Sequence, residues 1–92
     1  MAFELNGVEY TYVVGSDINR DGMYLEVAEK RDEISPLFEI FYSDVTHEMS
    51  MNTFKPNLPV PLLEWALTIA KQRLPASTTS YESMENSSTP KP

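Results

Sequence analysis

The fold is decided by the stretch Val8-Glu9-Tyr10-Thr11-Tyr12-Val13-Val14. Large side chains stand at every second position, and successive side chains of a β-strand point to opposite faces of its sheet. β-Branched and aromatic residues, which favour strands, make up most of the stretch. We assign four side chains to the face that packs on a core: Val8, Tyr10, Tyr12 and Val14. The opposite face then carries Glu9, Thr11 and Val13.

An Asn-Gly pair precedes this strand and separates it from a short alternating stretch at residues 3–5. Asn6 and Gly7 both tolerate the positive φ of a type I′ turn, so the pair is a strong signal of a β-hairpin. The hairpin sets Glu4 opposite Glu9, and like charges in that position are mildly destabilising. A bulge within one continuous strand is therefore the alternative.

Three further alternating stretches follow, at residues 23–28, 37–42 and 47–52. A polar loop at 15–22 precedes the first of them, and a charged turn at 29–36 separates the first from the second. Strands joined by short connections pair antiparallel with their neighbours in sequence. Their predicted inner-face residues are Met23, Leu25, Val27, Phe38, Ile40, Tyr42, His47, Met49 and Met51. The register predicted for the last hairpin sets Phe38 beside Met51, Ile40 beside Met49 and Tyr42 beside His47.

Residues 62–74 have the period of a helix, with Pro61 at the first helical position and Pro75 as its predicted end. The apolar arc spans about 200°, which is wider than a surface helix usually shows. It contains Leu62, Leu63, Trp65, Ala66, Leu67, Ile69, Ala70 and Leu74. We expect this helix to cover the inner face of the sheet.

The predicted fold class is α+β: an antiparallel meander sheet of four to five strands with one C-terminal helix packed on one face. Residues 1–75 form a single domain in this interpretation. Residues 76–92 are rich in Ser and Thr and have few hydrophobic side chains, so we predict a disordered tail.

The chain has 92 residues, with 7 basic and 14 acidic side chains and a formal net charge of −7. An excess of acid argues against nucleic acid and against anionic membrane surfaces as partners. Cysteine is absent, which excludes disulfides and thiol nucleophiles. With neither a signal peptide nor a long apolar segment in the sequence, we expect a soluble cytoplasmic protein without a cofactor.

A candidate calcium loop lies at residues 17–22, where Asp17, Asn19 and Asp21 alternate before Gly22. The twelfth position of such a loop needs a bidentate glutamate, and here it holds Ala28. Asp, Asn and Gly are also the residues that ordinary turns use. The pattern therefore favours a plain hairpin loop, with calcium binding as the less favoured hypothesis.

Catalytic candidates are few. His47 is the only histidine, and alternation places it on the inner face next to Tyr42, which favours a structural role. Glu26 and Glu39 are predicted neighbours on an open face, where water keeps both carboxylates ionised and no pocket raises a pKa. Met49 and Met51 on the inner face are explained by core packing. We therefore expect a protein that is not an enzyme and has no metal site.

The outer face of the sheet is the candidate binding surface. Each predicted strand places a glutamate there, and none of the strand positions assigned to this face is a lysine or arginine. The glutamates are Glu4, Glu9, Glu26, Glu39 and Glu48. The expected pairing forms an apolar row of Val13, Tyr24 and Phe41 that ends at Glu48. Beside it we expect a row of Thr11, Glu26, Glu39 and Ser50. Aromatic rings flanked by carboxylates suit a cationic, partly apolar partner.

These patterns predict a non-catalytic, acidic binding module. Its seven predicted contact residues are Thr11, Val13, Tyr24, Glu26, Glu39, Phe41 and Glu48. The expected partner is the basic surface of another protein, as for small inhibitors and immunity proteins, which is an analogy at the level of class. The alternative is a homo-oligomer that associates through the wide apolar face of the helix, at Leu63, Trp65 and Leu67.

Overall fold

The computed structural model describes residues 3–78. These residues form five strands, a short 3-10 turn and one helix: β1 (Phe3–Leu5), β2 (Val8–Asp17), β3 (Gly22–Glu29), η1 (Lys30–Asp32), β4 (Phe38–Ser43), β5 (Met49–Thr53) and α1 (Val60–Thr78). Every strand pairs antiparallel with its neighbour in sequence, so the sheet order is β1-β2-β3-β4-β5. The predicted α+β meander with one C-terminal helix is confirmed.

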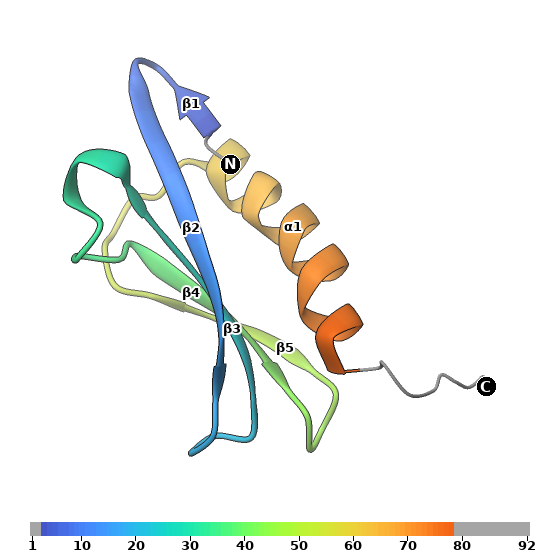
Figure 1. Cartoon of the computed structure of the whole chain (residues 1–92). Coiled ribbons are helices and arrows are strands. Elements are labelled where there is room, and N and C mark those ends of the chain that lie inside the picture. Colours follow the sequence, from blue (N-terminus) through green and yellow to red (C-terminus); the bar gives the residue numbers. More distant parts are fainter. Residues whose placement is uncertain (1–2, 79–92) are drawn as a thin grey trace.

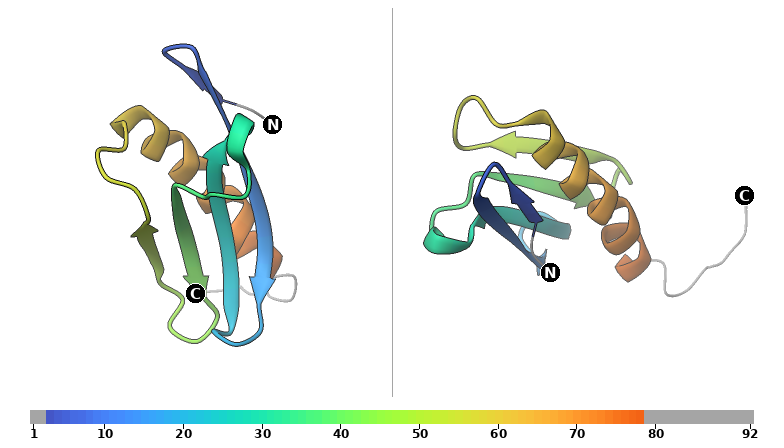
Figure 2. Two further views of the ribbon diagram at one scale, coloured as in Figure 1. Left: turned by 90° about the vertical axis from the view of Figure 1, so that its left-hand side faces the viewer. Right: turned by 90° about the horizontal axis from the view of Figure 1, so that it is seen from above.

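The molecule has two layers. Figure 1 shows α1 on one side of the sheet and the β3–β4 connection with η1 on the other side. In the left view of Figure 2, α1 lies behind the strands and crosses them diagonally. The sheet therefore has an inner face, which packs against α1, and an outer face, which the helix leaves uncovered.

The core lies between α1 and the strands β3 and β4. One helix stripe is fully buried, because residues four apart lie on the same face of a helix: Leu62, Ala66, Ala70 and Leu74. It packs against the inner-face side chains of β3 and β4: Leu25, Val27, Phe38 and Ile40. Burying a side chain such as Phe38 or Leu62 stabilises the fold by about 2 kcal/mol. The predicted division into an inner and an outer face is thus observed.

The N-terminal hairpin follows the sequence prediction. Asn6 has a φ of 52° and Gly7 a φ of 81°, both in the left-handed region that a type I′ turn requires. Glu4 pairs directly with Glu9, and both side chains are exposed. The alternative of a bulge in one continuous strand is therefore excluded.

The register predicted for the β4–β5 hairpin is wrong by two residues. The observed pairs are Phe38 with Thr53, Ile40 with Met51 and Tyr42 with Met49. The connection is longer than predicted, because the His47 amide donates to the Ser43 carbonyl and His47 turns the chain at a φ of 63°. His47 is consequently exposed in the connection, and not on the inner face of a strand.

His47 nevertheless contacts the residue that was predicted beside it. Its Nδ1 lies 3.0 Å from the Tyr42 hydroxyl, within hydrogen-bonding distance. The predicted proximity to Tyr42 is therefore confirmed, although the two residues are not cross-strand partners.

The β2–β3 connection is shorter than the predicted loop at 15–22. β2 continues to Asp17 and β3 begins at Gly22, so only four residues, 18–21, form the connection. Gly15 belongs to β2 and pairs with Tyr24.

The helix is longer than predicted at both ends. It begins at Val60, and the prediction that Pro75 ends it is wrong, because α1 continues to Thr78. A proline inside a helix removes one backbone hydrogen bond, but the helix can continue beyond it. Three residues of the predicted tail thus belong to α1, and residues 79–92 of that tail lie outside the described residues, as do residues 1 and 2.

Candidate binding surface on the outer sheet face

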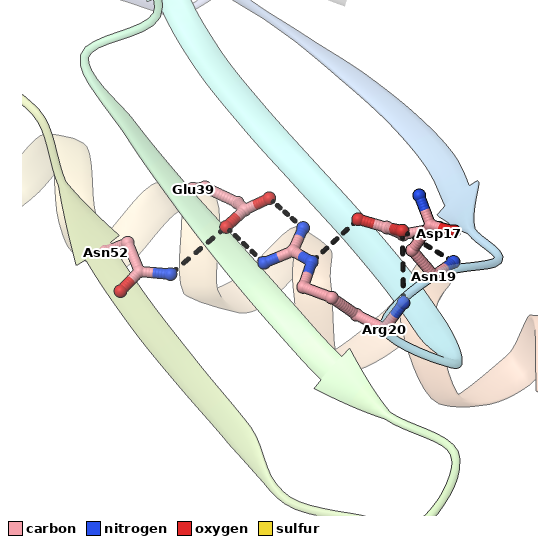
Figure 3. A network of polar contacts seen from close by, with 5 residues as sticks. All are labelled: Asp17, Asn19, Arg20, Glu39 and Asn52. Carbon is pink, nitrogen blue, oxygen red and sulfur yellow. Dashed lines mark hydrogen bonds and ion pairs between the residues drawn. The ribbon is translucent and has the colours of Figure 1, made fainter.

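Arg20 organises the polar contacts of the outer face. It extends from the β2–β3 connection across the sheet to Glu39 on β4 (Figure 3). Its Nη1 and Nη2 donate to the two carboxylate oxygens of Glu39 at 3.1 and 2.6 Å, and its Nε donates to Asp17 Oδ2 at 2.6 Å. Asn52 on β5 donates from Nδ2 to Glu39 Oε1 at 3.2 Å. A bidentate guanidinium–carboxylate pair is among the stronger polar contacts in proteins.

The same guanidinium covers an aromatic ring. Arg20 Cζ lies 4.2 Å from the centroid of the Phe41 ring, which is a cation–π contact. Phe41 is only 9% exposed. Its ring also lies close to Gly22, where an added Cβ would collide with the ring and with the Tyr42 carbonyl oxygen. Glycine is therefore required at position 22 for Phe41 to lie flat beneath Arg20.

These contacts set the protonation of the acids around Arg20. The guanidinium hydrogen bonds lower the pKa of Glu39, and this effect outweighs the burial that disfavours its charged form. Arg20 lowers the pKa of Asp17 in the same way. The two carboxylates together raise the pKa of Arg20. Glu39 is thus held as an anion although only 5% of it is exposed.

The loop sequence explains how Arg20 is positioned. Asp17 Oδ1 accepts hydrogen bonds from the backbone N–H groups of Asn19 and Arg20 at 3.0 and 3.2 Å, which is the side-chain turn that aspartate favours. Asp21 then reverses the chain at a φ of 53°. Both carboxylate oxygens of Asp17 are therefore occupied by contacts within its own loop.

Residues 17–22 span the hairpin connection between β2 and β3, and calcium binding by this loop stays a hypothesis. The first candidate ligand, Asp17, is bound to Arg20 and to backbone N–H groups. Among the described residues, no three or more His, Cys, Asp or Glu side chains are grouped so that they could hold a metal ion.

The predicted exposure of Glu39 is wrong. Glu26 and Glu39 are direct cross-strand partners, so both lie on the outer face as predicted. Glu39, however, is buried by its neighbours and paired with Arg20. The expectation that no cationic side chain interleaves with these glutamates is also wrong, because Arg20 enters the face from a loop.

The predicted apolar row of Val13, Tyr24 and Phe41 is wrong at Val13. Tyr24 and Phe41 do pair, but Val13 pairs with Glu26 in the adjacent row. The partner of Tyr24 on β2 is Gly15, and the tyrosine ring lies over it, since a Cβ at Gly15 would come within 2.6 Å of the Tyr24 hydroxyl. Tyr24 and Phe41 are thus packed into the face itself.

Two other predicted neighbours also differ from the observed ones. Phe41 is paired with Ser50 and not with Glu48, which lies in the β4–β5 connection just before β5 and is exposed. Thr11 pairs with Ala28, one row beyond Val13 and Glu26. The predicted contact residues therefore do not form the two continuous rows expected.

A smaller part of the predicted surface remains accessible. We call it the acidic patch and define it by four residues around a small depression of about 50 Å³, next to the β3–β4 connection: Thr11, Val13, Glu26 and Glu33. Val13 is 58% exposed. Among the residues that the structure describes, Glu26 makes no ion pair and no side-chain hydrogen bond. The acidic patch thus combines exposed Val13 with exposed Glu33 and half-buried Glu26.

The apolar helix residues proposed for self-association do not form one patch. Trp65 stacks on Phe3 with ring centroids 4.9 Å apart and meets Tyr12 edge-on at 5.8 Å. Leu63 and Leu67 are each two residues from Trp65, which places them about 160° away around the helix axis. Both are half-buried against the core. The width of the apolar arc is explained by packing within the chain on both flanks of α1.

Sequence reasoning missed Arg20 and Asn52. Arg20 is the first basic residue of the chain. It stands in the connection between β2 and β3, and Glu39 lies on the neighbouring strand β4. A glutamate with bulky neighbours on both sides needs a cation or several hydrogen bonds, so this lone arginine was a usable signal. Asn52 carried no comparable signal, because its contact depends on the β4–β5 register.

The protein thus has a small α+β fold, and carboxylates lie on the sheet face that α1 does not cover. In comparisons with known proteins, no family model, no curated sequence and no solved structure matches this chain. Within residues 3–78, no helix is both long enough and apolar enough to cross a membrane.

Proposed function

We propose that this chain is a non-catalytic binding module that masks a basic site on another protein, as inhibitors and immunity proteins do. The observation that supports the proposal most is Glu26: it stands on the outer face next to exposed Val13 and has no cationic partner among the described residues. Arg20, which neutralises Glu39, does not neutralise Glu26.

The physical basis is electrostatic steering followed by apolar contact. A chain with a net charge of −7 attracts a positively charged partner over several ångströms, and opposite fields raise the association rate. Val13, which is exposed, then supplies apolar area within the acidic patch. A lysine or arginine of the partner next to an exposed apolar residue would complement this arrangement.

The test compares two substitutions that make the same change of charge on opposite layers of the molecule. Glu26→Lys alters the acidic patch, and Glu64→Lys alters an exposed position of α1. Tagged wild-type protein and both variants are used to capture proteins from the native host, and the captured proteins are identified by mass spectrometry. We expect a basic protein that wild type and Glu64→Lys retain and that Glu26→Lys loses.

The captured protein is then purified, and its affinity is measured by calorimetry at two salt concentrations. Steering by carboxylates requires weaker binding to wild type at higher salt. Equal affinity for wild type and Glu26→Lys, with unchanged circular dichroism, would contradict a role for the acidic patch.

A further inference from the structure

The free edge of β5 presents backbone groups that no other described strand pairs with. In an antiparallel ladder, alternate residues exchange both backbone hydrogen bonds with one neighbouring strand. The Ser43 amide donates to the Glu48 carbonyl, and the Phe54 amide donates to the Leu37 carbonyl, so even-numbered residues of this segment face β4. The N–H and C=O groups of Met49, Met51 and Thr53 therefore point away from the sheet.

No described strand or helix lies alongside this edge. Figure 2 shows β5 at one margin of the sheet, with only the connection to α1 rising above it. Exposed edges in proteins are commonly protected by a charge or a proline. β5 has neither between Met49 and Phe54, although the chain as a whole carries a net charge of −7. The edge of β5 is therefore an uncharged segment of a protein with a net negative charge.

We infer that β5 pairs with β5 of a second copy of this chain, in an antiparallel arrangement about a two-fold axis at Met51. Antiparallel partners share a face of the sheet, so a symmetric register must pair odd residues with odd residues. The register centred on Met51 pairs Met51 with itself and Met49 with Thr53 of the second copy. Each such pair exchanges two backbone hydrogen bonds, which gives about six in total and uses every outward-pointing group of the strand.

The side chains match in this register. On the inner face, Met51 meets its own copy, and its 38% exposed side chain would lose contact with water. On the outer face, Ser50 lies opposite Asn52 of the second copy, so polar side chains meet. At each end, Glu48 of one copy lies opposite Phe54 and next to Lys55 of the other, which brings opposite charges close together.

The opposite margin of the sheet is less suited to the same pairing. β1 already covers the first three residues of β2. The C-terminal part of α1 projects past the margin of β2 in the left view of Figure 2. A two-fold axis perpendicular to the sheet keeps both helices on the same face, so pairing through β2 would have to accommodate two helix ends at the junction.

Pairing through β5 has a consequence for recognition. The two five-stranded sheets would join into one continuous sheet, with both helices on one face and both acidic patches on the other. The dimer would present the acidic patch twice on one surface. The pairing does not itself depend on the proposed partner, because it involves neither Val13 nor Glu26.

The first test measures the mass of the full chain by size-exclusion chromatography with light scattering over a range of concentrations. We expect wild type to approach twice its monomer mass of 10.5 kDa as the concentration rises. Met51→Lys places two positive charges on the two-fold axis and should remain monomeric. Ile34→Lys makes the same change at a side chain that is 93% exposed in the β3–β4 connection, and it should dimerise as wild type does.

A second variant separates loss of pairing from loss of folding. Met51→Pro removes an N–H that points outward and leaves the bonds to β4 in place, so the folded monomer should persist. Monomeric Met51→Pro with the circular dichroism of wild type supports the pairing. A wild-type chain that stays monomeric at every concentration, or a dimer that neither Met51 variant dissociates, overturns it.

Cysteine substitution tests the register directly, because the chain contains no cysteine. In the proposed dimer the Cα atoms of the two Met51 residues lie about 5.5 Å apart, which a disulfide can span. Two Thr53 residues would lie about 14 Å apart, which is too far. On mild oxidation, Met51→Cys should give a covalent dimer and Thr53→Cys should not. Equal cross-linking of the two variants would contradict this register.

Discussion

Glu26 and Glu39 face each other across β3 and β4 on the same side of the sheet, yet they have opposite environments. Glu39 is almost fully buried and is held by Arg20 and Asn52. Glu26 has neither contact and borders a small depression that Val13 also lines. Glu39 is therefore bound within the folded chain, whereas Glu26 makes no ion pair and no side-chain hydrogen bond among the described residues. The position of Arg20 in the β2–β3 connection determines this difference, because its guanidinium reaches Glu39.

The largest expected effect comes from removing that arginine. Arg20→Ala leaves Glu39 as a buried carboxylate with only Asn52 as a donor, and it uncovers the Phe41 ring. We expect the free energy of unfolding to fall by about 2 kcal/mol, a value reduced because the Arg20 side chain is itself 41% exposed. The measurement is urea denaturation followed by circular dichroism.

Arg31→Ala is the matched control for this loss. Arg31 pairs with Glu29 two residues away, and its side chain is exposed. An exposed pair of this kind contributes about 0.5 kcal/mol or less. Equal destabilisation by the two substitutions would show that the Arg20 contacts have no special weight.

A smaller effect is expected from pH. Because Arg20 lowers the pKa of Glu39 in the folded state, the unfolded chain binds the proton more tightly. The stabilisation is complete above the ordinary glutamate pKa of 4.5 and is lost as the pH falls through the lower folded pKa. We expect wild type to lose more stability between pH 6 and pH 3 than Glu39→Gln does, as measured by denaturation at each pH.

Both proteins contain the same other acidic residues. The difference between their losses of stability with falling pH therefore reports on Glu39, apart from an indirect effect on Asp17. If Glu39→Gln lost stability as steeply as wild type, the ion pair with Arg20 would not account for the acid sensitivity. Glu39→Gln should also be less stable than wild type at pH 7, where the pair is fully formed.

The fold was predictable from sequence because its signals are local. Alternation identified the strands and their inner faces, and Asn6-Gly7 fixed the first hairpin. The register was less predictable, since a shift by two residues leaves every side chain on the same face. Such shifts account for the two errors in pairing, at β2–β3 for Val13 and at β4–β5 for Phe38.

The candidate site was only partly predictable for a different reason. Alternation assigns side chains to faces but does not describe a long side chain that enters a face from a loop. Arg20 does this, and it turns Glu39 from a surface acid into a buried one. Close packing had the same effect on the aromatic rings, because Gly15 and Gly22 provide room for Tyr24 and Phe41 to lie flat. Both effects reduced the predicted surface to the acidic patch.

The smallest expected effect sharpens the contrast most directly. Glu26→Gln removes a charge next to exposed Val13 without breaking any contact among the described residues, so we expect the free energy of unfolding to change by less than about 0.5 kcal/mol. Its sign should be stabilising if it is resolved at all, because the chain has an excess of negative charge that opposes the compact state. Urea denaturation of Glu26→Gln beside Glu39→Gln at pH 7 provides the measurement. Glu39→Gln should then lower the free energy of unfolding and Glu26→Gln should not. Equal losses would mean that the contact with Arg20 does not distinguish the two carboxylates.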